Sequence, residues 1–340
     1  MEASPEAYVE TMVAVFREVR RVLRDDGTVW ANLGDCYASI KSSGIWGGVD
    51  HGEHGEKAPH RNWRGNDRKP KDLVGIPWMV AFALRADGWY LRSEIVWAKP
   101  NPMPESVRDR PVCAHEKVFL LSKSRRYFYD AEAVKEPATC EGDERHLRTD
   151  KSKVNGGPQE DRGSRQRTGN PVHGRNLRNF WTIATEGFSA AHFATFPKKL
   201  VEPCILAGTP AKGCCPACGA PWVRTIAVVQ PAGHKPRLDE KRFKCGSGGH
   251  PSSLRTKMGW HPSCDCAPAH TVPATVLDPF VGAGTTLLVA ERLGRDSIGI
   301  EISPEYAAMA QARIRADLGT VSGGGEAEQD AGPLFSEAYR

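Results

Sequence analysis

Two carboxylates and two glycines in the C-terminal part of the chain have the spacing of a nucleoside-binding site. An apolar run ends at Leu277, and Asp278 leads into a turn that contains Gly282 and Gly284. Glycines let the backbone approach a ligand closely, and the amides of the helix that follows point to the same place. Glu301 ends a second apolar run, 301 − 282 = 19 residues after the first glycine, where a carboxylate can accept hydrogen bonds from ribose hydroxyls. The pattern predicts a nucleoside site at the carboxyl ends of two adjacent strands.

Other nucleotide-binding patterns fit this turn less well. A phosphate-loop ATPase is disfavoured because the chain has no Gly-Lys-Ser/Thr sequence here. A dinucleotide-dependent dehydrogenase would carry a third glycine about where Leu287 lies. A tight turn that binds nothing is the structural alternative, and the presence of both Asp278 and Glu301 argues against it.

Six of the ten cysteines are clustered in sequence: Cys214, Cys215, Cys218, Cys245, Cys264 and Cys266. Cys215-Pro-Ala-Cys218 is a knuckle of the zinc-ribbon type, and Cys264-Asp-Cys266 offers a second pair. Four thiolates would form a closed, structural zinc site. The 45 residues between the pairs exceed the usual ~15–20, and the second pair is C-x-C. Cys214 and Cys245 are therefore spare candidate ligands, and reduced free thiols are the alternative.

Residues 145–178 form a basic segment without helical or strand periodicity. Three acidic residues in it are outnumbered by nine basic ones, so that the segment nets +6: Arg145, Arg148, Lys151, Lys153, Arg162, Arg165, Arg167, Arg175 and Arg178. Such a segment can contact the phosphates of duplex DNA, with strong salt dependence. A solvated loop is the alternative. The loop at 38–70, with Arg61, Trp63 and Arg64, is a weaker candidate on the same grounds.

The global properties exclude a membrane protein. No apolar run approaches the ~20 residues of a membrane span. The N-terminal MEASPEAY lacks the basic start and apolar core of a signal peptide. We therefore expect a cytoplasmic protein without a disulfide framework. The net charge of +5 is compatible with an acidic partner but does not require one.

Strands alternate with capped helices along the chain, which predicts an α/β sheet. Helices are expected to begin at Ser4-Pro5, Pro77, Pro197, Gly284 and Ser303-Pro304. Strands are expected at 28–33, 90–97, 117–122, 275–280 and 297–302. Residues 131–180 lack periodicity, and the tail from Leu318 has the composition of a disordered segment.

Several of these stretches, in this order, resemble one enzyme family. DPFVGAGTT (278–286) followed by GIEISPEY (299–306) is similar to the S-adenosylmethionine-binding motifs of DNA amino-methyltransferases. HFATFPKKLVEPCILAG (192–208) resembles the motif that precedes them in the permuted beta subgroup, of N(4)-cytosine/N(6)-adenine type. GTVWANLGDCYA (27–38), the long stretch 75–111 and HEKVFLLSKSRRYFYDAEAV (115–134) resemble that subgroup too. The resemblance covers most of residues 5–135 and 180–315.

The resemblance assigns roles to residues at matching positions. The cofactor would contact two groups: Asp278, Pro279, Phe280, Gly282, Gly284, Thr285, Thr286 and Glu301 in the glycine turn, and Phe193, Thr195, Phe196 and Pro197 in the closing motif. Phe193 and Phe196 could equally be core aromatics. Asn32 and Asp35 would face the pocket, although a turn-capping role fits Asp35 as well.

The chain departs from the family at the catalytic motif. Family members carry Ser/Asn/Asp-Pro-Pro-Tyr/Phe/Trp at the end of a central strand, where it holds the target amine and stacks on the flipped base. No Pro-Pro pair exists in this sequence. In relatives of this layout the motif shortly precedes the helix that begins here at Ser4-Pro5. We therefore expect the chain to start after its catalytic motif, with the motif strand missing from the sheet and Asn32 and Asp35 as weak substitutes.

The sequence thus predicts a Rossmann-like, S-adenosylmethionine-dependent methyltransferase fold of the α/β class, with circularly permuted motif order and a zinc-ribbon-like insertion. The resemblance implies methyl transfer to the exocyclic amine of cytosine or adenine in specific duplex DNA, as in restriction–modification or phage systems. A non-catalytic remnant, or half of an enzyme that a partner chain completes, is the alternative. The expected parts are the catalytic half (1–135), a basic target-recognition loop (136–180), the closing motif and helix (181–210), the zinc insertion (211–270), the cofactor-binding half (271–317) and the tail (318–340).

Overall fold

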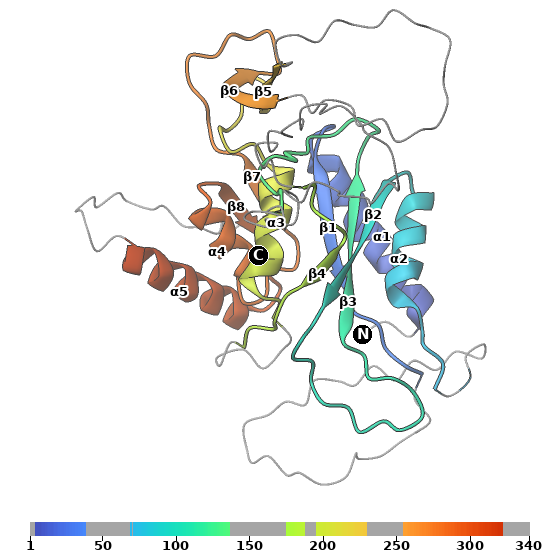
Figure 1. The fold of residues 1–340 in the computed structure, drawn as a ribbon. Helices are drawn as coiled ribbons and strands as arrows, with labels where there is room; N and C mark the ends of the chain where they lie inside the picture. Colours follow the sequence, from blue (N-terminus) through green and yellow to red (C-terminus); the bar gives the residue numbers. More distant parts are fainter. Residues whose placement is uncertain are drawn as a thin grey trace, which may run out of the picture. The chain divides into compact units, whose positions relative to one another are not determined.

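A computed structural model of the chain describes residues 4–38, 69, 71–136, 175–187, 195–229 and 254–321. The chain divides into two compact units (Figure 1). Unit 1 comprises Met1–Tyr129, Arg178–Thr209 and Thr275–Arg340, and unit 2 comprises Asp130–Leu177 and Pro210–Ala274. No helix among the described residues is long and apolar enough to cross a membrane.

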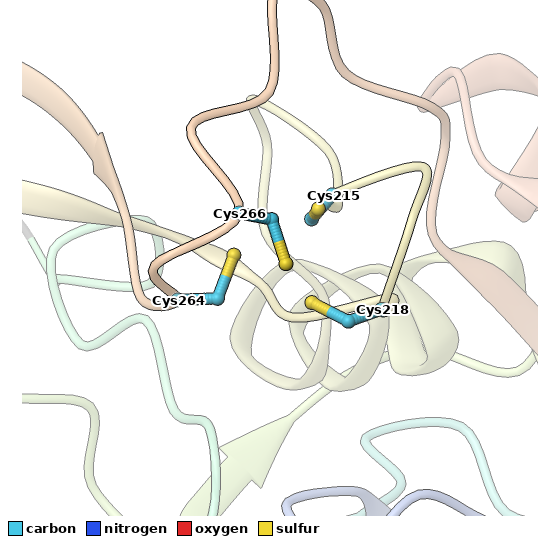
Figure 2. A group of neighbouring side chains, drawn as sticks. All are labelled: Cys215, Cys218, Cys264 and Cys266. Atoms are coloured by element: carbon cyan, nitrogen blue, oxygen red, sulfur yellow. The ribbon is translucent and has the colours of Figure 1, made fainter.

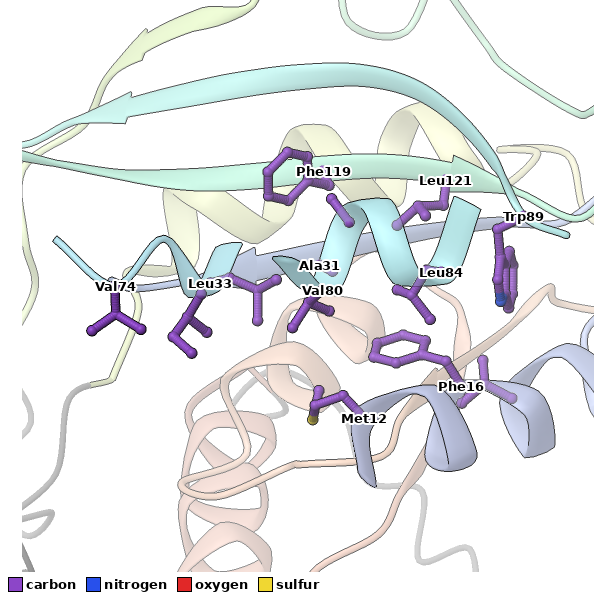
Figure 3. Packing of buried hydrophobic residues seen from close by; sticks show 13 residues of the cluster. Met12, Phe16, Ala31, Leu33, Val74, Val80, Leu84, Trp89, Phe119 and Leu121 are labelled. Atoms are coloured by element: carbon purple, nitrogen blue, oxygen red, sulfur yellow. The ribbon is translucent and has the colours of Figure 1, made fainter. Parts of the chain in front are cut away.

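Two helices of unit 1 form as their caps and apolar spacing predict. Helix α1 (Pro5–Val22) begins at Ser4, whose Oγ accepts a hydrogen bond from the Ala7 amide at 3.1 Å. Helix α2 (Ile76–Ala86) has a proline in its first turn and ends at Asp87. Their apolar faces meet side chains of β1 and β3 in one buried cluster, which includes Phe16, Leu84 and Phe119 (Figure 3). This core fixes the N-terminal part of unit 1.

The larger sheet of unit 1 has four strands in the order β1-β3-β2-β4. Strands β1 (Thr28–Leu33) and β2 (Tyr90–Ala98) each pair antiparallel with β3 (His115–Ser122). The short β4 (Phe180–Thr182) adds to β2 in parallel. The sequence did not predict β4, because three residues are too few to show a period. Among the described residues, β1 pairs with no strand other than β3.

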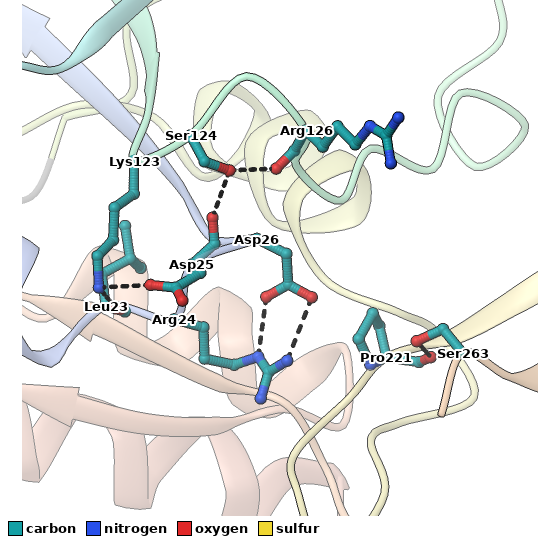
Figure 4. Close-up of polar contacts among 9 residues, drawn as sticks. All are labelled: Leu23, Arg24, Asp25, Asp26, Lys123, Ser124, Arg126, Pro221 and Ser263. Atoms are coloured by element: carbon teal, nitrogen blue, oxygen red, sulfur yellow. Dashed lines mark hydrogen bonds and ion pairs between the residues drawn. The ribbon is translucent and has the colours of Figure 1, made fainter. Parts of the chain in front are cut away.

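Polar contacts tie the end of α1 to the end of β3 (Figure 4). The Lys123 ammonium donates to the Leu23 carbonyl at 2.9 Å and pairs with the Asp25 carboxylate at 2.9 Å. The Ser124 hydroxyl donates to the Asp25 carbonyl at 2.8 Å. These bonds satisfy backbone carbonyls in the turn that leads from α1 into β1.

A separate pair of parallel strands carries the glycine turn. β7 (Thr275–Asp278) pairs with β8 (Asp296–Gly299), and α4 (Thr285–Arg292) connects them. Helix α3 (Lys198–Gly208) packs against both α4 and β1, and α5 (Pro304–Val321) packs against α4. The predicted strand to residue 302 is too long, since β8 ends at Gly299. The predicted tail from Leu318 begins too early, since α5 continues to Val321.

Unit 2 contains a two-stranded antiparallel ribbon of β5 (Trp222–Val229) and β6 (Leu254–Pro262). The register places Trp222 opposite Pro262 and shifts between Thr225 and Ile226. This ribbon was not predicted from the sequence. The predicted insertion 211–270 lies within unit 2.

Candidate cofactor site

The loop after β7 folds over the carboxyl ends of both parallel strands. The Asp278 side chain accepts a hydrogen bond from the Phe280 amide at 2.9 Å, which turns the chain. The Ile300 amide donates to the Asp278 carbonyl at 2.9 Å, and the Val281 amide donates to the Ile300 carbonyl at 3.1 Å. The loop is therefore fixed by the strand ends that it covers.

The two glycines of the loop have different environments. Both have positive φ, +48° at Gly282 and +76° at Gly284, where a side chain is strained. A Cβ at Gly284 would lie 2.9 Å from the Ala310 Cβ, so this glycine permits close packing on α5. A Cβ at Gly282 would meet only one atom within 4 Å, the Phe280 carbonyl oxygen at 4.0 Å. The missing side chain at Gly282 leaves open space above the backbone, which suits a ligand.

Glu301 lies next to this open space. Its Oε2 accepts a hydrogen bond from the Gly282 amide at 2.9 Å, and its Oε1 accepts one from the Ser303 amide at 3.0 Å. A carboxylate has about four lone-pair positions, so each oxygen keeps one for a further donor. The arrangement can accept two vicinal hydroxyls while the protein holds the carboxylate in place.

Arg313 of α5 holds the loop by hydrogen bonds, a role that was not predicted from the sequence. Its Nη1 donates to the Ala283 carbonyl and to the Thr285 hydroxyl, both at 2.9 Å. Burial lowers the pKa of this guanidinium from its usual value. Thr285 is itself buried, whereas the next helix residue, Thr286, is half-buried. No local sequence pattern indicated this contact, because Arg313 lies on α5, 28 residues after Thr285.

Apolar side chains are exposed around the loop. Phe280 is 54% exposed and Ile302, which follows Glu301, is 97% exposed. Large apolar side chains with this exposure can contact the faces of an aromatic base. A role for Ile302 was not predicted from the sequence, because the residues around it indicated only the end of a strand.

The predicted closing motif is described only from Thr195 onward, and Phe193 lies outside the described residues. Pro197 is the N-cap of α3. Phe196 is half-buried and packs against the apolar cluster that includes Val201, Ile205 and Leu287. This packing matches the core-aromatic alternative for Phe196, and its contact with a cofactor stays a prediction.

The two weak catalytic candidates are both engaged in structural contacts. Asn32 is half-buried on β1, and its side-chain amide donates to the Lys117 carbonyl at 3.2 Å. Asp35 Oδ1 accepts hydrogen bonds from the amides of Cys36, Gly75 and Ile76, at 2.9, 2.9 and 3.1 Å. Asp35 therefore caps the start of α2, as its structural alternative predicts.

In unit 2, the four predicted metal ligands come together. The Sγ atoms of Cys215, Cys218, Cys264 and Cys266 all lie within 4.8 Å of one another (Figure 2). A hydrogen bond from the Cys218 amide is the main cause that lowers the pKa of the Cys215 thiol to about 7. Cys214 instead pairs its backbone with Val272, and Cys245 lies outside the described residues.

Most of the predicted DNA-contacting arginines lie outside the described residues: Arg145, Arg148, Arg162, Arg165 and Arg167. Arg175 is described, and its guanidinium pairs with the Glu136 carboxylate at 2.7 Å. The backbones of these two residues also exchange hydrogen bonds. Arg175 therefore closes a bridge within unit 2.

Comparison with known proteins gives a consistent match. The sequence model of a family described as DNA methylase matches residues 1–215 and 271–312. The type II methyltransferase M.SmaI of Serratia marcescens is 35% identical over 307 residues, covering 90% of this chain and 74% of that protein. M.Cfr9I of Citrobacter freundii is 34% identical over 327 residues, covering 93% and 74%. The solved PvuII DNA methyltransferase (cytosine-N4-specific) aligns with 93% of this chain and 77% of that chain, at 15% identity and a TM-score of 0.48.

The chain belongs to the DNA methylase family. It is a DNA methyltransferase of the α/β methyltransferase fold, with S-adenosylmethionine as the methyl donor, so the predicted family and enzyme class are confirmed, whereas the permuted motif order, the zinc-ribbon-like insertion and its zinc ion stay predictions. The family match passes over residues 216–270, which contain three of the four clustered cysteines. The cysteine cluster is thus largely outside the part that defines the family.

Proposed function

We propose that the loop at Asp278–Gly284 holds the methionine and ribose parts of S-adenosylmethionine, and that Glu301 accepts hydrogen bonds from its ribose hydroxyls. The contact between the Glu301 carboxylate and the Gly282 amide carries this proposal, because it places a charged acceptor beside open backbone. Thr285 and Thr286 begin the helix behind the ligand. The target is the exocyclic amine of cytosine or adenine at specific sites in duplex DNA, in a restriction–modification or phage setting.

Methyl transfer requires mainly that the protein position the cofactor and the target base. The sulfonium of the cofactor supplies an activated methyl group. The exocyclic amine is a poor nucleophile because its lone pair is delocalised into the ring, so acceptors must hydrogen-bond its protons. The base must leave the stack to reach the site, and in-line attack then depends on orientation. A fixed loop and a fixed carboxylate meet the requirement on the cofactor side.

Two substitutions test the cofactor site. Glu301→Gln removes one charged acceptor, and hydrogen bonds to charged groups contribute about 1.5–3 kcal/mol, so Kd for S-adenosylmethionine should rise by about 10–150-fold. Glu305→Gln removes an equal charge from an exposed position in the first turn of α5 and should leave Kd unchanged. Calorimetric titration measures both. Equal affinities for all three proteins would refute the assigned role of Glu301.

Methyl transfer is tested with tritiated S-adenosylmethionine and mixed genomic DNA, followed by nucleoside analysis. We expect label in N(4)-methylcytosine or N(6)-methyladenine. Label in 5-methylcytosine would refute the proposed acceptor.

A second candidate is a cofactor- and DNA-binding chain that needs its catalytic tetrapeptide from another segment or a partner chain. Two observations favour it: the sequence has no Pro-Pro pair, and the described strands of unit 1 form two sheets, with β1 paired only to β3 and β7 only to β8. This candidate predicts cofactor binding without methyl incorporation. Addition of a segment that carries the tetrapeptide would then restore transfer.

We also propose that the basic segment 145–178 contacts DNA, and the segment's net charge of +6 supports this contact. A cytoplasmic location is part of the proposal as well. Removal of each phosphate-binding side chain should lower the slope of log K against log salt by about 0.9. Filter binding of duplex DNA by Arg165→Gln/Arg167→Gln at several salt concentrations measures the slope. A slope identical to that of the unmodified chain would remove this segment from the interface.

A further inference from the structure

The four-cysteine cluster lies apart from the methyltransferase site in sequence and has its own geometry. Cys215 and Cys218 belong to a turn before β5, and Cys264 and Cys266 follow β6 directly. Their four sulfur atoms face one shared space (Figure 2). In a tetrahedral thiolate site with Zn–S bonds of about 2.3 Å, the sulfurs lie about 3.8 Å apart. The observed limit of 4.8 Å for all pairs is close to that arrangement.

Hydrogen bonds join the two segments that carry the four cysteines. The Gly219 amide donates to the Cys215 carbonyl at 2.8 Å, and the Cys215 amide donates to the Ala220 carbonyl at 2.8 Å, which closes the knuckle. The Ser263 hydroxyl donates to the Pro221 carbonyl at 2.7 Å, so the second cysteine pair is bound to the same turn (Figure 4). Two segments 45 residues apart are thus joined at the ligand positions.

The donor set selects the kind of ion. None of the four cysteines forms a disulfide, and four sulfur ligands complete a tetrahedral shell without a position for water. Thiolates favour zinc over oxygen-seeking ions such as magnesium. Thiolates this close repel one another, and a divalent cation removes that repulsion. We infer that Cys215, Cys218, Cys264 and Cys266 bind one structural zinc ion.

The position of the site indicates what the ion does. Trp222 of β5 pairs with Pro262 of β6 at the end of the ribbon next to the cysteines. An isolated two-stranded ribbon is marginally stable in water. The ion cross-links the chain just before β5 to the chain just after β6, and therefore closes the loop that contains the whole ribbon. Closure of a loop of this length reduces the entropy of the unfolded chain.

Metal analysis of the full chain, purified without chelator, tests the inference. We expect about one zinc per chain by elemental mass spectrometry, as a site with four cysteine ligands requires. The double variant Cys218→Ser/Cys264→Ser should lose the metal. Cys113→Ser changes an exposed thiol outside the cluster and should retain it. Zinc bound equally by the double variant, or absent from the unmodified chain, would overturn the site.

A second measurement needs no variant and so does not depend on folding of the mutants. Cobalt exchanged into the unmodified chain should give the strong visible absorption of a tetrahedral thiolate site. Hydrogen exchange after zinc removal should show loss of protection in β5 and β6 while β1 and β3 stay protected. Octahedral cobalt spectra, a mass that reports disulfides, or unchanged protection of the ribbon would each contradict the proposed role.

Discussion

Alanine substitutions at Gly282 and Gly284 should distinguish the part of the cofactor loop that stabilises the fold from the part that binds the cofactor. Gly282→Ala puts a side chain at φ +48°, and the left-handed region costs about 1–2 kcal/mol. Its Cβ meets no atom closer than 4.0 Å, so nothing is added for packing. Gly284→Ala incurs a similar backbone cost and also places its Cβ 2.9 Å from the Ala310 Cβ. Overpacking costs about 1–3 kcal/mol, which brings the expected loss to about 2–5 kcal/mol.

These energies give distinct outcomes in two assays. At about 2–4 °C per kcal/mol, Tm should fall by about 2–8 °C for Gly282→Ala and by about 4–20 °C for Gly284→Ala. The new methyl at Gly282 lies in the space assigned to the cofactor, so Kd for S-adenosylmethionine should rise at least about tenfold at a temperature where the variant is folded. Differential scanning and titration calorimetry measure both values. A Gly282→Ala protein with unchanged Kd would refute the assignment of that space to the ligand.

Three further substitutions test the packing and electrostatics. Arg224→Met leaves the buried Asp130 carboxylate without its cation and should lower the free energy of unfolding, measured by urea denaturation, by about 3 kcal/mol. A loss below about 1 kcal/mol would show that solvent stabilises the unpaired carboxylate. Ser4→Ala removes the cap of α1 and should lower Tm by about 2–4 °C, and no change would deny the cap a role. The Arg292 guanidinium lowers the pKa of Asp317, so the stability that Arg292→Met removes should be constant at neutral pH and vanish as pH falls below the ordinary aspartate value of 3.8. A difference independent of pH would contradict this.

Elements with strong local signals were predictable from the sequence. Ser4-Pro5 and the apolar spacing after it gave α1, and the run TVWANL gave β1 with the same bounds as in the structure. The glycine turn was predictable because few residues other than glycine adopt positive φ. The proximity of the four cysteines followed from ligand spacing, although 45 residues separate the pairs.

The rest depends on contacts that are distant in sequence. β4 forms because three residues pair with the edge of β2. β5 and β6 pair although residues 230–253 separate them in the sequence, and no turn was predicted between them. Asp35 caps α2 from 40 residues away, so its position after a strand suggested a pocket instead. Arg313 reaches the loop through tertiary packing of α5, which no local pattern announces.

The cofactor site is the central claim, and hydrogen exchange with and without saturating S-adenosylmethionine tests it most directly. We predict new protection in peptides that cover Asp278–Gly284 and Glu301–Ser303, and we predict that this protection is largely lost in Glu301→Gln at a lower cofactor concentration, close to the Kd of the unmodified chain. Protection confined to other peptides, or protection here that survives Glu301→Gln unchanged, would contradict the account.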